Sequence, residues 1–373
     1  MKKLQWVRKF NLNIYYPMLA IASVTFIILY NISVSTLDRG SKLDAICMNR
    51  SNSSFTLSER IIMEPEVESR DIHMLILINS NSHNAQGKER RQAIRQTWGS
   101  KAKSHCQHCL LVFLLGKSSS QQDVANLAEA NHYRDIMIVN LKDSYNDLTN
   151  KLLNCLVWVN KIRPTYILKT DDDVYIDIPK VLLYMQGQHY RRFYGGIIYK
   201  NGDVPRNPSH RHYVSQHMFV SDYFPPFCKG SMYILSGNLL PELLTLAQQI
   251  PPFYVDDAYI GVLMHCASVK PVSISGFLTT KYLPYYMNAI GSCSLSGYFG
   301  LGDGLSSSQI ELVHRTLVEI DMNCYICPLN ICFHVSKVTT AAIVFLLLIC
   351  ISILLYKRPC LCRLLKIRPK TND

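Results

Sequence analysis

Short, strongly apolar runs alternate with amphipathic stretches through the middle of the chain. Runs rich in Ile, Leu and Val are typical of buried parallel strands, and apolar residues at helical spacing are typical of the helices that connect them. The predicted strands are residues 72–78, 110–115, 136–141 and 166–168, and the predicted helices are residues 88–98, 121–130 and 144–161. This alternation predicts an α/β fold with a mostly parallel sheet flanked by helices.

Two longer apolar runs lie outside this body. Residues 14–30 and 338–356 contain no charged residue. At about 1.5 Å per residue, each helix would come close to spanning a hydrocarbon core of about 30 Å. We expect a transmembrane signal-anchor at 14–30 and a second transmembrane helix at 338–356, with the basic tails 1–13 and 357–373 in the cytosol. A cleavable signal peptide is the alternative for the first run, and a buried core helix is the alternative for the second.

The region between the two runs is then lumenal. Residues 31–70 are polar and rich in Ser and Asn, which predicts a stem, and residues 71–337 are the predicted catalytic domain. Asn49 and Asn52 are N-glycosylation acceptors in the stem.

Ten of the thirteen cysteines lie between the two apolar runs. An oxidising lumen favours disulfides among them, with pairings that spacing does not determine. A zinc site is the alternative for two C-x-x-C pairs, which are Cys106 with Cys109 and Cys324 with Cys327.

The net charge of +12 is concentrated in the tails. Residues 1–13 contribute +4 and residues 357–373 contribute +5, which leaves +3 for everything between them. We therefore expect no nucleic-acid partner. A composition of 48% apolar and 18% charged residues also excludes disordered and collagen-like chains.

An acidic triplet, Asp171–Asp173, follows the last of these predicted strands after Lys169-Thr170. Ligands of open α/β sheets bind beyond the carboxyl ends of the strands. Adjacent carboxylates repel one another and need a compensating cation when they are partly desolvated. Mg²⁺-like ions bind through one or two carboxylates and complete their shell with phosphate oxygens and water. Asp171 and Asp173 therefore predict a site for a metal and a nucleotide diphosphate, with a solvated acidic turn as the alternative.

A second acidic pair, Asp256-Asp257, opens an apolar helical stretch. Carboxylates at a helix N-terminus are stabilised by the helix dipole, so capping is one interpretation. The other is a general base that deprotonates an attacking hydroxyl.

Five motifs occur in the order found in one known family. They are RQAIRQTW at 91–98, DSYNDLTNK at 143–151, KTDDDVY at 169–175, YFPPFCKGSMYILS at 223–236 and VDDAYIG at 255–261. Over about 88–265 the chain resembles the β-1,3-galactosyl- and β-1,3-N-acetylglucosaminyltransferases, glycosyltransferase family 31.

The resemblance implies a Golgi membrane enzyme whose lumenal domain has a GT-A-like fold. Such an enzyme uses a UDP-sugar and Mn²⁺ (or Mg²⁺) and inverts the anomeric centre. It transfers galactose, the first expectation, or N-acetylglucosamine to the 3-hydroxyl of a glycan on a glycoprotein or glycolipid. The oligomeric state stays open.

The family's site residues map onto this chain. The resemblance places the metal on Asp171 and Asp173 and the catalytic base on Asp257. The expected cofactor-binding residues are Arg91, Arg95, Lys169, Asp171 and Asp172. Structural ion pairs are the alternative for the basic residues.

Two of the chain's several departures from the family pattern bear on the site and the topology. Ser231-Met232 replaces small glycines, which would reshape the acceptor side, and a second membrane run is not typical of the family. Four aromatic residues are candidates for a sugar-stacking wall, with core packing as the alternative; they are Tyr223, Phe224, Phe227 and Tyr233.

Two other functions compete with the transferase. A catalytically inactive, membrane-tethered glycan-binding or scaffold protein would not need acidic residues at both sites. A metal-dependent phosphohydrolase would need a nucleophile or a second metal cluster, and the sequence offers neither.

Overall fold

The computed structural model describes the greater part of the predicted catalytic domain. The described residues are 42–48, 57, 60–67, 71–106, 108–188, 191–200, 202–279, 295, 297–323 and 345–347. The predicted signal-anchor, both tails and all but three residues of the predicted second membrane helix lie outside this set. Among the described residues, no helix combines the length and the apolarity that crossing a bilayer requires.

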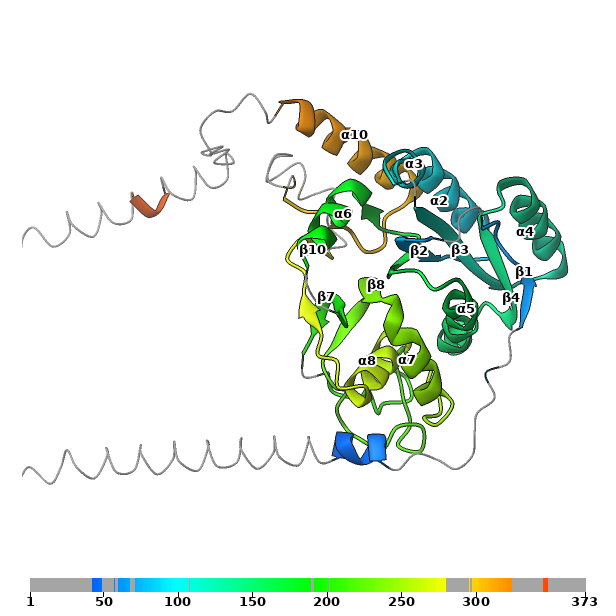
Figure 1. Ribbon diagram of the computed structural model, residues 1–373, viewed down its shortest axis with the longest axis vertical. Coiled ribbons are helices and arrows are strands. Elements are labelled where there is room, and N and C mark those ends of the chain that lie inside the picture. The colour runs from blue at the N-terminus through cyan, green and yellow to red at the C-terminus, as the bar shows by residue number, and fades with distance from the viewer. Residues whose placement is uncertain are drawn as a thin grey trace, which may run out of the picture.

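An eight-stranded sheet forms the centre of the body (Figure 1). Its spatial order is β1-β4-β3-β2-β5-β8-β7-β9. The strands are β1 (Ile61–Met63), β2 (Met74–Asn79), β3 (Cys109–Lys117), β4 (Ile136–Lys142), β5 (Tyr166–Asp171), β7 (Tyr194–Tyr199), β8 (Phe227–Ser236) and β9 (Val272–Ser273). Strands β4, β3, β2 and β5 are parallel, whereas β8 is antiparallel to both of its neighbours. A small second sheet contains β6 (Tyr175–Ile176), β10 (Phe277–Leu278) and β11 (Gly300–Leu301).

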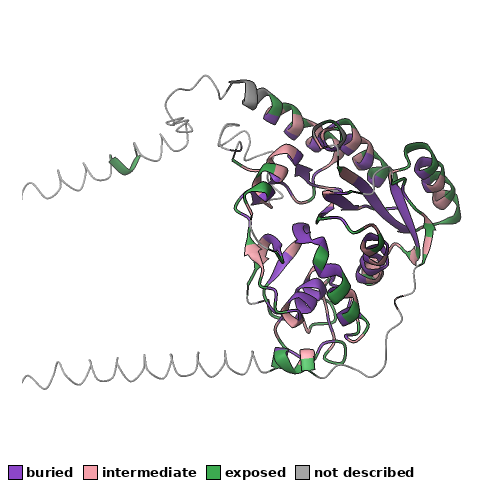
Figure 2. Cartoon of the chain, in the orientation of Figure 1, coloured by how far each residue is buried: buried purple, intermediate pink, exposed green. Residues whose placement is uncertain are grey.

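Helices cover both faces of the large sheet. They are α2 (Ala85–Gln96), α3 (Trp98–His105), α4 (Ser120–Tyr133), α5 (Leu148–Ile162), α6 (Ile178–Gln186), α7 (Leu240–Ala247), α8 (Asp256–Cys266) and α10 (Ser307–Asn323). Strand β2 shows how the two faces are filled. Leu75 and Leu77 join the core that contains α5, α7 and α8, while Met74 and Ile76 join the core that contains α2. Alternate residues thus serve opposite layers, and the central strands are buried (Figure 2).

The prediction of an α/β fold with a mostly parallel sheet and flanking helices is confirmed. A strand buried on both faces has no polar alternation, which is why the apolar runs identified β2 to β5. The predicted long helix differs in one detail. It begins as a 3₁₀ turn over Tyr145–Asp147, and the Ser144 Oγ donates to Asp147 Oδ2 at 2.7 Å instead of capping a backbone N–H.

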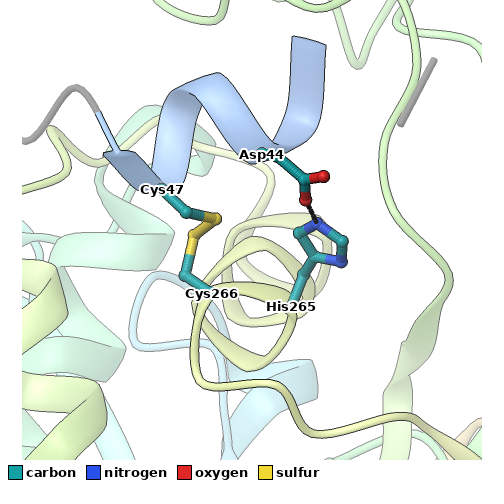
Figure 3. Close-up of a disulfide and its surroundings, with 4 residues drawn as sticks. All are labelled: Asp44, Cys47, His265 and Cys266. Atoms are coloured by element: carbon teal, nitrogen blue, oxygen red, sulfur yellow. Dashed lines mark ion pairs between the residues drawn. A yellow bond between two sulfur atoms is a disulfide. The ribbon is translucent and has the colours of Figure 1, made fainter. Parts of the chain in front are cut away.

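Two segments of the predicted stem attach to this body. Strand β1 pairs antiparallel with β4, with Ile61 opposite Val139. Residues 42–48 are helical, and Cys47 forms a disulfide with Cys266 at the end of α8 (Figure 3). Beside it, Asp44 Oδ1 lies 3.3 Å from His265 Nε2. The folded body therefore includes residues N-terminal to position 71.

A second disulfide joins Cys106 to Cys109. It disfavours the zinc alternative, because disulfide sulfurs are not thiolate ligands. The other predicted zinc pair, Cys324 and Cys327, lies outside the described residues. Cys155 and Cys228 are buried free thiols, and burial raises the pKa of the Cys228 thiol to about 12.

Loss of the Cys47–Cys266 disulfide should destabilise the body strongly. The bond spans 219 positions, and the chain-entropy model assigns about 5 kcal/mol to a loop of this length. We expect Cys47→Ser/Cys266→Ser to lower the free energy of unfolding by about 2–5 kcal/mol in denaturant titrations. The matched control is Cys106→Ser/Cys109→Ser, whose separation of 3 predicts a smaller loss, about 2 kcal/mol. Equal losses in the two variants would contradict the entropic argument.

Candidate active site

The carboxyl ends of β2 and β5 bring the acidic triplet to one edge of the sheet. In the parallel register Asn79 lies opposite Asp171, so the loops that follow the two strands meet. Asp171 Oδ1 lies 2.9 Å from Lys169 Nζ and 3.5 Å from Asn79 Nδ2. The Asp171 side chain remains 32% exposed, which leaves it able to reach a ligand. Burial and the nearby Asp256 and Asp172 carboxylates raise its pKa, against the opposing effect of Lys169.

Asp172 points into the protein. Its Oδ2 accepts hydrogen bonds from Ser80 Oγ at 2.6 Å and from the Asn81 N–H at 3.2 Å. Its Oδ1 lies 3.3 Å from an Arg90 guanidinium nitrogen. These contacts anchor the loop after β2, and they favour a positioning role for Asp172 over the predicted contact with a cofactor.

Asp173 is the member of the triplet whose charge is least compensated. Its Oδ1 is buried and has no hydrogen-bond partner among the described groups. Burial, followed by the Asp171 and Asp172 carboxylates, raises its pKa to about 7. A buried carboxylate oxygen without a donor fits a bound cation. Within the described part of the chain, no group of three or more His, Cys, Asp and Glu side chains is placed to hold a metal. Two carboxylates still match Mg²⁺-like ions, because phosphate oxygens and water complete their coordination.

Lys169 connects the triplet to the second acidic pair. Its buried ammonium lies 2.9 Å from Asp171 Oδ1, 3.4 Å from Asp256 Oδ2 and 2.6 Å from the carbonyl oxygen of Gly230. Burial alone would lower the lysine pKa, but the carboxylates of Asp171 and Asp256 raise it. The ammonium donates hydrogen bonds to Asp171 Oδ1 and to the Gly230 carbonyl oxygen, and it forms an ion pair with Asp256. The contacts therefore indicate that Lys169 positions the two acidic sites rather than gripping a donor sugar nucleotide directly.

Asp257 lies in the first turn of α8, next to Gly230 of β8. Its Oδ2 accepts from the Gly230 N–H at 2.8 Å, and its Oδ1 accepts from the Ala258 N–H at 2.8 Å. Burial and then the neighbouring Asp256 raise the Asp257 pKa to about 7, although the two N–H donors and Lys169 lower it. A fixed carboxylate that titrates near neutrality is suited to act as a general base.

Arg91 and Arg95, predicted as donor-side cations, are ion-paired within the protein. Arg91 is 1% exposed, and its guanidinium donates to both carboxylate oxygens of Glu129, at 2.9 and 2.6 Å. Arg95 pairs with Glu129 and with Asp135, each at 2.8 Å. The contacts favour the ion-pair alternative. Helical spacing contained part of this signal, because Arg91 and Arg95 are four residues apart and lie on the same face of α2.

Replacing Arg91 should reduce stability rather than donor affinity. Breaking a buried ion pair by removing one partner typically costs about 3–5 kcal/mol, because the other charge stays buried. We expect Arg91→Met to lose stability in this range in denaturant unfolding. Arg91→Met/Glu129→Met should recover part of the loss. A stable Arg91→Met protein with a raised KM for a UDP-sugar would instead support donor binding.

A cavity of about 540 Å³ continues along the same sheet edge. Its lining residues are His83, Lys117, Ser118, Ser119, Asn140 and Lys142. The His83 N–H donates to Asn81 Oδ1 at 2.7 Å, and Asn81 in turn donates to Asp172, so the cavity lies beside the triplet. Sequence reasoning missed this site because its lining comes from the ends of β3 and β4 and from the segments that follow β2 and β3, which are separate in the sequence.

Most of the predicted aromatic wall is core. Phe224, Phe227 and Tyr233 are buried, and Phe224 stacks on Phe253 with ring centroids 5.6 Å apart. Met232 is also completely buried. Its side chain therefore fills the interior instead of reshaping an acceptor surface.

Comparison with known proteins identifies the chain's family. A family model described as Galactosyltransferase matches residues 89–275, half of the chain. The chain belongs to the galactosyltransferase family. This galactosyltransferase-family protein is therefore a glycosyltransferase, which confirms the predicted family and enzyme class.

Several named relatives of this galactosyltransferase-family protein are similar over much of its length. UDP-GalNAc:beta-1,3-N-acetylgalactosaminyltransferase 1 of Mus musculus is 30% identical over 244 residues, covering 64% of this chain and 72% of the relative. Beta-1,3-galactosyltransferase 4 of Mus musculus is 31% identical over 212 residues, covering 48% and 57%. Among solved structures, mouse xyloside xylosyltransferase 1 is 14% identical, covers 62% of this chain and 96% of its own, and superposes with a TM-score of 0.32. That score is too low to support any conclusion.

Proposed function

We propose that this protein is an inverting β-1,3-hexosyltransferase with a GT-A-like catalytic domain. It transfers galactose or an N-acetylhexosamine from a UDP-sugar to the 3-hydroxyl of a glycan. The observation that carries the proposal is the bridge made by Lys169, which lies 2.9 Å from Asp171 and 3.4 Å from Asp256. Lys169 thereby connects Asp171, in the candidate diphosphate site, to the acidic pair that contains the candidate base, Asp257. The β-1,3 names of the relatives support the linkage.

The donor diphosphate binds at the carboxyl edge of the sheet. Asp171 and Asp173 would hold Mn²⁺ or Mg²⁺, and the orphaned Asp173 oxygen supports this assignment. When bound, the ion neutralises the charge that develops on the UDP leaving group. The adjacent cavity, with Lys117 and Lys142 in its lining, accommodates the remainder of the nucleotide.

Asp257 carries out proton transfer on the acceptor. The Gly230 and Ala258 N–H groups fix its carboxylate so that one oxygen accepts the proton of the acceptor 3-hydroxyl. The acceptor oxygen then bonds to the anomeric carbon from the face opposite UDP. The bond between that carbon and the UDP oxygen breaks with its electron pair on UDP, so the configuration is inverted.

The enzyme acts in the Golgi lumen, anchored by residues 14–30 and 338–356. The disulfides Cys47–Cys266 and Cys106–Cys109 support an oxidising compartment. A tag after Asp373 should be digested by protease added to sealed Golgi vesicles, while the body is protected. Protection of that tag would contradict the two-span topology.

The proposed activity can be tested with the full-length protein in detergent. It would be incubated with Mn²⁺, a panel of UDP-sugars and mixed glycan acceptors, and acceptor-dependent UDP release would be followed. We expect turnover with one donor and a β-1,3 linkage in the product by NMR. A folded protein that binds UDP but turns over no donor would support the inactive glycan-binding alternative. A protein that does not bind UDP would contradict the diphosphate site.

A further inference from the structure

A group of aromatic and basic side chains lies next to the catalytic end of α8. We refer to Tyr145, His210, Arg211, His212 and Tyr254 as the Tyr145 cluster. The Tyr145 ring meets the Tyr254 ring edge-on at 5.8 Å, and its hydroxyl is hydrogen-bonded to His212 Nδ1. The Arg211 guanidinium lies over the Tyr145 ring, 5.3 Å from its centroid. The cluster thus joins the turn after β4, the loop before β8 and the residues that lead into α8.

The Tyr145 cluster lies on the base side of the site. Burial and the charges of Asp256 and Asp257 raise the pKa of Tyr145, while Arg211 lowers it. Tyr145 therefore interacts with both the acidic pair and Arg211. Tyr254, whose ring contacts the Tyr145 ring, lies two residues before Asp256, the first residue of α8. This contact places the Tyr145 cluster beside the N-terminal end of α8, where an acceptor would reach Asp257.

Arg211 is available to a ligand. Its side chain is exposed, and no ion pair to it is found among the side chains that the structure describes. A second arginine of the same loop behaves differently, because Arg206 donates to the carbonyl oxygens of Val214, Phe219 and Ser221 at 2.5–2.8 Å. Arg206 thus holds the loop in shape while Arg211 projects from it.

The chemistry of the Tyr145 cluster suits a charged sugar. The half-buried rings of Tyr145 and Tyr254 offer apolar surface to a sugar face. A guanidinium binds a carboxylate or sulfate through paired, charge-assisted hydrogen bonds. Burial, together with the charges of Arg211 and His210, lowers the pKa of His212, which favours the neutral imidazole; its ring nitrogens can hydrogen-bond to a hydroxyl.

We propose that the Tyr145 cluster is the acceptor subsite and that Arg211 selects acceptors with an anionic carboxylate or sulfate on the accepting sugar. This inference rests on the proposed function, because it takes Asp257 as the base. The ring of Tyr145 supports the sugar, and Arg211 pairs with its anionic group.

Binding can be measured without turnover in full-length Asp257→Asn saturated with UDP and Mn²⁺. Three probes share a free 3-hydroxyl: benzyl β-galactoside, its 6-sulfate and benzyl β-galacturonide. We expect the sulfate or the galacturonide to bind roughly 10- to 100-fold more tightly than the neutral galactoside by calorimetry. The two charged probes distinguish sulfate from carboxylate recognition.

Variants of Arg211 then test whether this residue causes the preference for charged probes. Asp257→Asn/Arg211→Gln should lose the preference for the charged probe, and Asp257→Asn/Arg211→Lys should retain part of it. The matched control is Arg191→Gln in the same background, because Arg191 is an exposed arginine beside Tyr166 at the opposite end of β5. It should bind all three probes as the parent does.

Several results would overturn the inference. Equal or undetectable binding of the three probes would do so, as would a preference that survives Arg211→Gln. With Asp257 intact, a rise in the KM for the UDP-sugar in Arg211→Gln would place Arg211 on the donor side. Charge-selective binding without turnover would retain the subsite and contradict the proposed function. Turnover by the wild-type protein without a preference for charged acceptors would retain the proposed function and contradict the subsite.

Discussion

Asp257→Asn is expected to lower kcat by about 10²- to 10⁴-fold, the usual contribution of a general base. The amide keeps the size of the side chain but cannot accept the proton of the acceptor hydroxyl. Since Asp257 faces the Gly230 and Ala258 N–H groups rather than the triplet, UDP binding should be nearly unchanged. Acceptor-dependent UDP release and UDP titration measure the two effects.

Glu242→Gln is the matched control for this variant. Glu242 is also a carboxylate in the first turn of a helix, α7, but it is exposed and pairs with Arg192. Its replacement should leave kcat unchanged. Residual activity of Asp257→Asn near the wild-type level would exclude Asp257 as the base.

The pH dependence follows from the same carboxyl group. Its pKa is raised from 3.8 to about 7, so kcat/KM should fall as the pH decreases through 7 and Asp257 becomes protonated. The stability effect has the opposite direction. Because the folded pKa exceeds the unfolded value, the folded state binds more protons, and stability contributed by this group is lost as pH rises from about 4 through 7. Asp257→Asn should therefore be more stable relative to wild type at pH 8 than at pH 4 in denaturant titrations.

The second large effect is expected at the acidic triplet. Asp171→Asn and Asp173→Asn should each lower kcat/KM by about 10²- to 10³-fold, because metal stabilisation of a leaving group contributes several kcal/mol. They should also abolish the dependence of UDP binding on Mn²⁺. Calorimetric titration of UDP with and without EDTA reads this out independently of turnover.

Asp172→Asn separates the structural role from the metal role. Asp172 holds Ser80, Asn81 and Arg90, so its replacement should reduce the free energy of unfolding. Asp173 has an unpartnered buried oxygen, so Asp173→Asn should not destabilise the fold. UDP binding that is indifferent to EDTA in the wild-type protein would refute the metal assignment.

The parallel half of the sheet was predictable because its strands are buried on both faces. Continuous runs such as 72–78 and 110–115 report this burial directly, and they correspond to β2 and β3. The antiparallel half was not predicted. Strand β8 contains Lys229, Gly230 and Ser231, so its apolar pattern is interrupted where the backbone approaches Asp257. The backbone N–H of Gly230 reaches the Asp257 carboxylate at this point, and the residues there do not follow the apolar pattern of a buried strand.

The sequence by itself determined which elements form and which of them carry carboxylates. The Asp triplet had to follow a buried strand, and Asp256-Asp257 had to open a helix, because both statements depend only on neighbouring residues. Motif order was enough to indicate the family, which the comparisons confirmed. The helical face shared by Arg91 and Arg95 was equally local, since spacing within a helix determines its faces.

Tertiary structure alone decided which partners these side chains meet. Lys169 meets Asp256 because β5 pairs with β8 and α8 packs against β8. Cys47 finds Cys266 across 219 positions, and Arg211 reaches Tyr145 from another loop. Local spacing carries no information about such distant pairs, because many chain paths share the same periodicity. The packing of two cores against one twisted sheet selects a single path, and with it the chemistry of the site.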